Sequence, residues 1–455
     1  MFATAALLRR AAVFVGGIDL DALEAVSGGD PEPLPGVEIL LDQSLLRRSE
    51  GADGEPRFEM LETIREYALE RLAQAGEEPI TRRAHAAYSL VLAEEGGPQI
   101  GGPESAAWLA RFDLAQDDLR AALDHLIAEG NAEWATRLAT ALLPYWRRRE
   151  LLTEGRQRLT AVLRLAGARP HTRADALYAA SLLTGEQGDG PTTRALLDES
   201  VALYRELADE RATLVALNAL AVACQLMGDL AAARTHLETV LREARRRGDL
   251  DNEARCLNNL ASVAHATGDL AEARRLYEEC RTAFEARADR TGAAWAIDQG
   301  GDVARDAGDR VSAGLLYSDS LRIFREEGDV DGIATALADL ARLAREDGDL
   351  ARARECCRQV LAIGSIGRRA LMRVVEELAA LAATAGESER AIVLFAAAAG
   401  LRNRLGRPAP VSHGRWMWRM IEDQRARLGR AAPAAWTRGW HMSAEQVMGY
   451  AGAEA

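Results

Sequence analysis

A repeat with a fixed period of 40 residues constrains this chain more than any other feature. Gly-Asp pairs recur at residues 188–189, 228–229, 268–269, 308–309 and 348–349. A second set of turn pairs lies midway between them, with Gly or Ala before the Asp, at residues 208–209, 248–249, 288–289 and 328–329. Gly favours the left-handed conformation that ends a helix, and Asp can cap the helix that follows. The sequence therefore predicts a turn every 20 residues.

Apolar residues between the turns follow the period of an α-helix. In one unit they stand at Leu257, Leu260, Ala261 and Ala264, and then at Ala273, Tyr277 and Cys280. These spacings put the apolar side chains on one face of each of two consecutive helices. A single hairpin cannot bury such a face alone, so the units are expected to stack into a solenoid. Gly300 and Gly301 fall inside a helix, where each costs roughly 1 kcal/mol relative to Ala, so their unit is expected to be the least stable.

The residues of this unit resemble those of the tetratricopeptide repeat. Ala261 and Ala273 stand where the two helices of the repeat cross, and small residues return 40 residues earlier and 80 residues later. The period of 40 exceeds the common 34, which implies helices that are nearly a turn longer. The resemblance implies a tetratricopeptide-like helical solenoid at residues 171–408.

The first 95 residues lack this period. Gly and Pro punctuate short helices, and residues 45–48 and 57–60 flank a polar, Gly-rich segment that is typical of a hairpin. Short helices followed by a hairpin predict a small winged-helix-like domain at residues 1–95. The expected fold class is thus all-α, a tetratricopeptide-like helical solenoid with an N-terminal winged-helix domain. A helical linker with the first helix pairs is expected at residues 96–170, and a C-terminal helical cap at residues 409–455.

The charge at the two ends bears on nucleic-acid binding. Residues 1–95 hold 9 Arg against 18 Asp and Glu, and the expected recognition helix carries Glu38 and Asp42 but no Arg. Phosphates need basic partners, so DNA is not expected to bind through this chain. Residues 401–455 reverse the balance, with 9 Arg against 4 Asp and Glu, and hold Trp416, Trp418, Trp436 and Trp440. They can cap the last repeat or offer a basic, aromatic surface to a partner.

The composition excludes several kinds of enzyme. The chain has 455 residues, a net charge of −13 and no Lys. A P-loop, a pyridoxal-phosphate site and a protein kinase each need a Lys, so no cofactor is expected. No two His stand three or four residues apart, and no Gly-x-Ser-x-Gly motif occurs. Neither a metal site nor a catalytic residue is therefore predicted.

The cysteine content and the length of the apolar runs indicate the cellular compartment of the protein. The chain has five Cys and an N-terminus that makes a poor signal peptide. Its longest apolar run, residues 391–401, is too short for a membrane helix. A reduced, cytoplasmic protein with buried Cys side chains and without a membrane span is expected.

Segments near both ends resemble one family. Residues 7–18, 41–46 and 58–68 look like the winged-helix module of large bacterial ATP-dependent transcriptional regulators, which are signal-transduction NTPases with numerous domains. Residues 114–123 resemble their first helix pair after the wing, and residues 436–447 are similar to the segment that closes their repeats. In that family a nucleotide-binding domain precedes the winged helix. This chain has no Gly-rich phosphate loop with Lys, so it is expected to be the sensor half, lacking the nucleotide-binding domain.

The concave face of the solenoid is the remaining candidate site. Positions off the apolar stripe of each first helix are expected to line it, and Asn218, Asn258 and Asp298 recur there at one phase. Amide side chains can hydrogen-bond the backbone of an extended peptide. The predicted partner-binding groove consists of Asn218, Arg255, Asn258, His265, Trp295, Asp298, Asp302 and Arg305, with Trp295 as its anchor. Solvated helix faces are the alternative interpretation of the same residues.

Together these features predict a non-catalytic protein-interaction or signal-sensing scaffold of a bacterial transcriptional regulator. Its expected partner is a protein or peptide held in the groove, and a separate NTPase or effector domain is one candidate. The alternative function is that of a DNA-binding transcription factor acting through the N-terminal winged helix.

Overall fold

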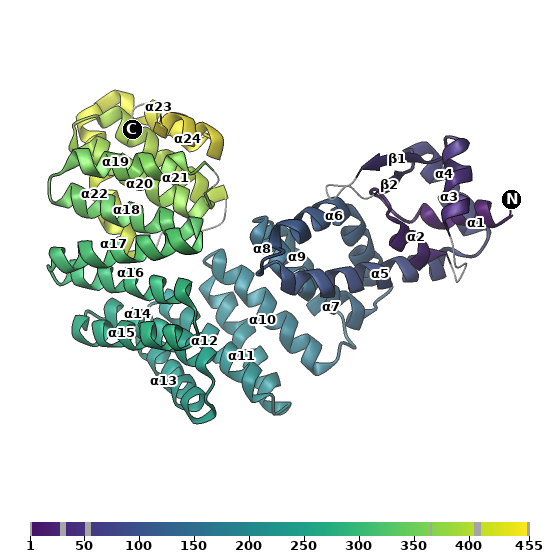
Figure 1. Ribbon diagram of the computed structural model, residues 1–455, viewed down its shortest axis with the longest axis horizontal. Helices are drawn as coiled ribbons and strands as arrows, with labels where there is room; N and C mark the ends of the chain where they lie inside the picture. Colours follow the sequence, from purple (N-terminus) through teal and green to yellow (C-terminus); the bar gives the residue numbers. More distant parts are fainter. Residues whose placement is uncertain (1, 28–32, 51–55, 365, 405–410, 453–455) are drawn as a thin grey trace. The chain divides into compact units, whose positions relative to one another are not determined.

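The computed structural model describes residues 2–27, 33–50, 56–364, 366–404 and 411–452 (Figure 1). Some of the Gly and Pro residues predicted to separate the short helices, at residues 28–32, and the polar segment of the hairpin at residues 51–55 lie outside the described residues. The chain divides into two compact units. Unit 1 comprises Met1–Leu183 with Glu199–Ala208, and unit 2 comprises Thr184–Asp198 with Asp209–Ala455.

Unit 1 begins with a winged helix. Its elements are α1 (Phe2–Ala11), α2 (Leu20–Val26), α3 (Leu34–Asp42), β1 (Arg47–Glu50), β2 (Pro56–Glu59) and α4 (Glu62–Gln74). The strands pair antiparallel with Arg48 opposite Phe58, so the predicted hairpin is present, with its first strand two residues later than expected. Phe58 packs into a buried cluster with Phe14, Leu40 and Leu72, which joins the hairpin to the helices.

Helix pairs follow the winged helix in unit 1. They are α5 (Glu78–Gln99), α6 (Ser105–Ala128), α7 (Ala132–Ala141), α8 (Leu143–Arg148) and α9 (Leu152–Leu163). The expected boundary at residues 95 and 96 lies within α5. Asp118 of α6 accepts hydrogen bonds from the backbone N–H groups of Val15 (2.6 Å) and Gly16 (3.3 Å). This carboxylate therefore holds the winged helix against the helix pairs.

Unit 2 is built from helical hairpins. Helices α10 (Pro170–Glu186) and α11 (Gly190–Glu206) contribute residues to both units. The first helices of the following hairpins are α12 (Glu210–Leu226), α14 (Leu250–Ala266), α16 (Arg290–Asp306), α18 (Val330–Glu346) and α20 (Arg368–Thr384). The second helices are α13 (Leu230–Arg247), α15 (Leu270–Ala286), α17 (Arg310–Glu327), α19 (Leu350–Ala362) and α21 (Ser388–Arg404). Each helix packs against the next one along the chain, which gives the predicted solenoid (Figure 1).

The turns between these helices use the chemistry that the period predicts. Asp249 caps α14 by accepting the backbone N–H of Asn252 at 3.1 Å, and the equivalent Asp residues cap the neighbouring helices in the same way. Gly248 before it is left-handed, with φ of 65°. Ala208 and Ala288 replace Gly at two equivalent turns and are left-handed too, with φ of 55° and 56°. These two residues carry backbone strain that Gly would avoid.

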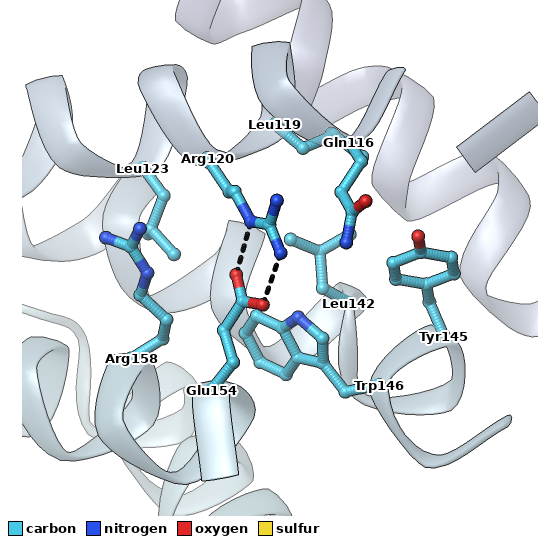
Figure 2. Close-up of a pocket in the computed structure, with 9 residues that line it drawn as sticks. All are labelled: Gln116, Leu119, Arg120, Leu123, Leu142, Tyr145, Trp146, Glu154 and Arg158. Atoms are coloured by element: carbon cyan, nitrogen blue, oxygen red, sulfur yellow. Dashed lines mark hydrogen bonds and ion pairs between the residues drawn. The ribbon is translucent and has the colours of Figure 1, made fainter. Parts of the chain in front are cut away.

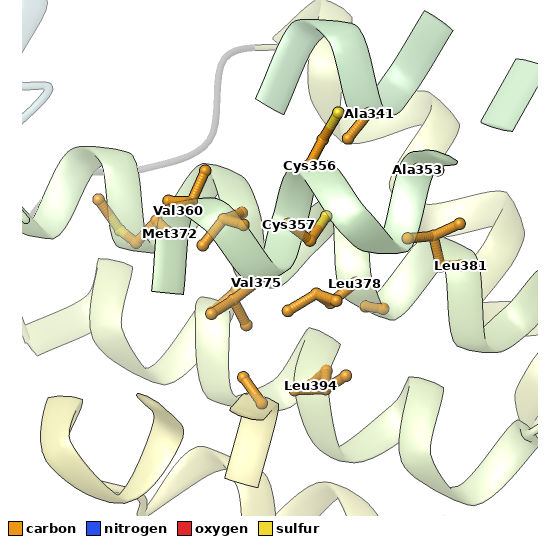
Figure 3. Packing of buried hydrophobic residues seen from close by; sticks show 14 of the residues in the cluster. Ala341, Ala353, Cys356, Cys357, Val360, Met372, Val375, Leu378, Leu381 and Leu394 are labelled. Atoms are coloured by element: carbon orange, nitrogen blue, oxygen red, sulfur yellow. The ribbon is translucent and has the colours of Figure 1, made fainter. Parts of the chain in front are cut away.

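The core of unit 2 runs between the helices of the hairpins. Ala341 and Ala353, where α18 crosses α19, are fully buried, and Leu378 of α20 packs beneath them (Figure 3). Cys356 and Cys357 lie in this core, and all five Cys of the chain are buried and free, as predicted. The all-α class, the tetratricopeptide-like solenoid and the small winged-helix domain are therefore confirmed.

Helices α22 (Val411–Leu428), α23 (Ala432–Trp440) and α24 (Ala444–Gly452), with the short 3₁₀ helix η1 (Gly429–Ala431), follow the last hairpin. A Cβ atom on Gly439 of α23 would lie 2.1 Å from the carbonyl oxygen of Val393 on α21, so these two helices meet backbone to backbone. Arg425 stacks its guanidinium over the ring of Trp436, 4.8 Å from its centroid. Arg and Trp side chains in this segment thus pack against each other, while Trp418 is exposed.

Candidate partner-binding groove

Polar side chains of neighbouring first helices join across the repeats. Asn259 of α14 donates its amide N–H to Asn218 Oδ1 of α12 at 3.0 Å. Gln225 of α12 donates to the Ser262 hydroxyl of α14 at 2.8 Å. Each bond ties one repeat to the next along the face that the apolar stripe leaves free. We use the name first-helix ladder for the polar side chains that lie along this face on the first helices α12, α14, α16, α18 and α20.

The eight predicted groove residues all lie on first helices, but they differ in exposure. Arg255 is exposed, Asn218 and Asp298 are buried, and the half-buried members are Asn258, His265, Trp295, Asp302 and Arg305. A partner can touch the exposed and half-buried members directly. The two buried residues can act only by holding their neighbours in place.

Trp295 contacts both the second helix of its own hairpin and the start of the next repeat. Its indole N–H donates to Asp329, the N-cap of α18, at 3.2 Å. Its ring lies 5.0 Å from the ring of Phe324, centroid to centroid. Part of the ring is therefore committed to packing within the protein, and only its remaining edge is accessible.

Charged side chains dominate the ladder on α16. Arg305 lies between two carboxylates, with Nη1 3.1 Å from Asp302 Oδ1 and Nη2 2.9 Å from Asp306 Oδ1. His265 Nε2 of α14 lies 2.9 Å from Asp306 Oδ2. The hydrogen bond with His265, together with the nearby Arg305, lowers the pKa of Asp306 to about 2. The ladder is thus already ordered by ion pairs before any partner binds.

Two fully buried carboxyl groups lie beneath this row. Asp298 of α16 and Asp339 of α18 both have 0% exposed surface. Asp298 Oδ1 lies 3.1 Å from the Ser320 hydroxyl, and Asp339 Oδ1 accepts from Arg373 Nη2 at 2.9 Å. Among the described residues, neither Oδ2 atom has a hydrogen-bond partner. Burial, and after it the charges of Asp339 and Asp302, raise the pKa of Asp298 well above its ordinary value.

Sequence reasoning placed Arg342 and Arg345 of α18 on this face but missed Asp339 and the α20 members of the network. Arg345 of α18 donates to Glu377 of α20, and Arg373 reaches back from α20 to Asp339. These residues stand 32 and 34 positions apart, so the 40-residue register does not align them. The pairing of Asn218 with Asn259, at a spacing of 41, could have been found from the period, and it would have pointed to Asp339 as the counterpart of Asp298.

A hollow in unit 1 offers no comparable site. Arg120 donates two hydrogen bonds of 2.6 Å to Glu154 across it, and Trp146 and Leu142 line its floor (Figure 2). Its volume of about 10 Å³ admits at most about one water molecule. The ion pair therefore closes this hollow to a small-molecule ligand.

The winged helix presents a face that suits protein better than DNA. On α3, Leu34, Glu38, Ile39 and Asp42 are exposed. Carboxylates at this position repel a phosphate backbone, whereas exposed apolar side chains can pack against another protein. Arg47 and Arg48 on the wing are the basic exposed residues nearest to this face in sequence.

The described residues can also be considered for metal binding and for membrane spans. In the described ranges, no cluster of three or more His, Cys, Asp or Glu side chains is arranged to hold a metal ion. None of the helices described has the length and apolar character needed to cross a membrane.

Comparison with known proteins supports both parts of the fold. A family model described as a winged helix-turn-helix domain matches residues 3–73, and two tetratricopeptide-repeat models match residues 214–286 and 333–364. The chain is 32% identical over 226 residues to a Mycobacterium tuberculosis protein named "Putative HTH-type transcriptional regulator Rv0890c". This match covers 47% of the chain, and the chain spans only 25% of that relative.

A second relative, an uncharacterized protein of Mycobacterium tuberculosis, is 38% identical over 78 residues, which cover 16% of the chain and 19% of the relative. The predicted combination of a winged helix with tetratricopeptide repeats, and its homology to HTH-type regulators, is thereby confirmed.

Two solved structures are similar to parts of this chain. One is a signal-transduction ATPase with numerous domains from Pyrococcus horikoshii that has a tetratricopeptide-repeat sensor; it is 12% identical, covers 98% of this chain and 65% of its own, and has a TM-score of 0.43. The other is a Rap protein complexed with competence and sporulation factor; it is 14% identical, covers 70% of this chain and 98% of its own, and has a TM-score of 0.49. Neither likeness bears on function.

Proposed function

We propose that this chain is a non-catalytic scaffold of a bacterial transcriptional regulator, and that a protein or peptide binds to the first helices of its repeats. The observation that carries the proposal is the first-helix ladder, in which hydrogen bonds run from one repeat to the next. A merely solvated face gains little from such bonds, because water satisfies the same groups. Side chains that are ordered in advance bind a partner at a lower entropic cost.

The accessible members of the ladder indicate how a partner would be held. Arg255, Asn258, Ser262 and His265 stand at helical spacing on one face of α14, and none of them is fully buried. Amide and hydroxyl groups can both donate to and accept from a peptide backbone. Arg255 adds a positive charge in an otherwise acidic protein, and it can select a partner with a carboxylate at that point.

A pair of charge reversals tests this proposal. Arg255→Glu changes an exposed residue in the groove, and Arg274→Glu makes the same change at an exposed residue of the second helix α15. A partner is first captured on the immobilised chain from source cells, identified by mass spectrometry and purified. Calorimetry with this partner should show Kd raised roughly tenfold or more for Arg255→Glu, since charged contacts at interfaces are worth on the order of 1.4 kcal/mol or more.

The control variant should bind as the wild type does, and both variants should keep the wild-type circular dichroism spectrum. Equal weakening by the two variants, or weakening by Arg274→Glu alone, would place the partner elsewhere.

The winged helix-turn-helix match at residues 3–73 favours a second candidate function, DNA binding. The exposed Glu38 and Asp42 on α3 oppose it. Titration of a generic DNA duplex at several salt concentrations separates the two functions. A DNA-binding protein loses affinity steeply as salt rises, whereas the scaffold should show almost no binding at any salt concentration.

A further inference from the structure

Three pairs of positions on the first helices recur with the 40-residue period, and we call each pair a rung. They are Asn218 with Asn259, Asn258 with Gln299, and Asp298 with Asp339, so that the two residues of each rung stand 41 positions apart and each rung follows the last by 40. In the first rung the two amides share a hydrogen bond of 3.0 Å. An amide contains both a donor and an acceptor, so a rung of amides can close at any pH. The third rung replaces both members with carboxyl groups.

The third rung is also the most deeply buried. Asp298 and Asp339 have no exposed surface, and the Oδ2 atom of each lacks a hydrogen-bond partner within the part of the chain that is described. Two ionised carboxylates cannot bond to each other, and a buried acceptor without a donor is unfavourable. If the two side chains face each other as Asn218 and Asn259 do, a single proton on one Oδ2 atom satisfies both.

We infer that the rung of Asp298 and Asp339 is a proton-binding site, in which the protonated Asp298 donates its O–H to the ionised Asp339. The repeat supports this assignment, because the same positions two periods earlier are joined by a hydrogen bond. The inference goes beyond the proposed function and does not depend on it, since it concerns how α16 is tied to α18 and not what binds there.

The surroundings decide which carboxyl group holds the proton. Arg373 Nη2 lies 2.9 Å from Asp339 Oδ1, and Arg342 Nη2 lies 3.8 Å from the same atom. The hydroxyl of Ser320 is the partner of Asp298, and it also lies 3.0 Å from the carbonyl oxygen of Tyr317. The two guanidinium groups stabilise negative charge on Asp339, so the proton resides on Asp298.

Other titratable groups near the rung come from every helix that packs against it. They are Asp302 and Arg305 on α16, Tyr277 on α15, Tyr317 on α17, Arg342 on α18, Arg373 on α20 and, through Asp306, His265 on α14. Burial, followed by Asp302, raises the pKa of Tyr317, and burial does the same for Tyr277, so both remain neutral. Although burial opposes its charge, Asp339 and the other carboxylates raise the pKa of Arg373.

Because of the bound proton, the stability of the packed repeats depends on pH in a defined direction. In the unfolded chain Asp298 releases its proton above its ordinary pKa of 3.8, whereas in the folded protein the pKa of Asp298 is raised. The folded chain therefore keeps a proton that the unfolded chain has lost. Stability from this site is therefore complete at low pH and is lost as pH rises through the raised pKa. Release of the proton places two adjacent negative charges between α16 and α18, next to the accessible Arg305.

Substitution of one member provides the test. Asp298→Asn replaces the proton with a permanent amide donor, while Ser320→Ala removes only the other hydrogen bond of Asp298. Urea unfolding of the full chain is measured from pH 5 to pH 8. The ratio of the wild-type to the Asp298→Asn unfolding constant should rise about tenfold per pH unit until Asp298 ionises, and Ser320→Ala should keep the wild-type pH dependence.

A second measurement needs no variant to fold. Infrared spectroscopy of wild-type protein with ¹³C-labelled Asp should show the C=O stretch of one protonated carboxyl group that persists to higher pH than the signals of the exposed Asp residues, and a foldable Asp298→Asn variant should lack it. A ratio of unfolding constants that stays constant from pH 5 to pH 8 would overturn the inference. So would the absence of a protonated Asp signal in the wild-type chain.

Discussion

Gly300 and Gly301 are adjacent in the middle of α16, and the structure predicts opposite effects when each is replaced by Ala. A Cβ atom on Gly300 would have Leu316 Cδ1 as its nearest neighbour, at the ordinary contact distance of 4.0 Å. A Cβ atom on Gly301 would lie 2.6 Å from the ring of Tyr317. Tyr317 is fully buried and its hydroxyl donates to Asp302 at 2.8 Å, so the ring has no room to withdraw.

The magnitudes follow from two competing terms. Ala is the better helix former by about 1 kcal/mol, so Gly300→Ala should stabilise the unit by about that amount. The same gain applies to Gly301→Ala, but forcing a methyl group into a packed site costs about 1–3 kcal/mol, and here it displaces a rigid ring. Because the ring cannot withdraw, the cost should lie at the upper end of this range, about 2–3 kcal/mol, and the net effect of Gly301→Ala should be a loss of about 1–2 kcal/mol.

Urea unfolding followed by circular dichroism at 222 nm distinguishes the two variants, with a midpoint that rises for Gly300→Ala and falls for Gly301→Ala. Because the two residues are neighbours in one helix, a difference in helix length cannot explain opposite signs. Stabilisation by both substitutions would show that the ring of Tyr317 does not approach the helix as described. The unit would then be weak for reasons of helix propensity alone.

Three further predictions concern turns, the join within unit 1, and the groove. Ala288→Gly should stabilise the chain by about 0.5–1 kcal/mol because it relieves the strain of a left-handed Ala. Gly248→Ala at the equivalent turn should destabilise the chain by a similar amount. Melting temperatures of the two variants that move in the same direction would contradict this prediction. Asp118→Ala should cost about 2 kcal/mol, since it leaves two backbone N–H groups without their acceptor, and urea unfolding of unit 1 measures the loss. Trp295→Ala should lower the melting temperature because the Trp295 ring packs on Phe324. Unchanged stability together with weaker partner binding would contradict this and show that the ring serves only to bind the partner.

The fold could be predicted because its determinants are local. A left-handed residue before Asp249 and the cap that Asp249 provides depend on a few neighbouring residues, and the 40-residue period repeats that signal many times. The left-handed Ala288 shows how strongly the period holds, since the turn forms there without Gly. Apolar spacing on a helix is equally local, so the core positions followed from it.

The ladder could be predicted only in part, because its bonds depend on how consecutive first helices lie beside each other. The recurrence of Asn218 and Asn258 indicated where polar side chains of the first helices meet, but the partner of Asn218 is Asn259, one position out of phase. Arg373 was missed because it pairs at a spacing of 34. The role of Gly301 was hidden for a similar reason: propensity reports only on its own helix, whereas the ring that requires this Gly comes from α17.

The most direct test of the central claim, that the first helices form the binding face, is a map of contacts with the partner. A photo-crosslinking amino acid is placed at Ser262 on α14 or at the exposed Thr282 on the second helix α15, and the full chain is irradiated with the purified partner. Crosslinks from position 262 with none from position 282 are the predicted result. Crosslinks from position 282 alone would contradict the assignment of the groove.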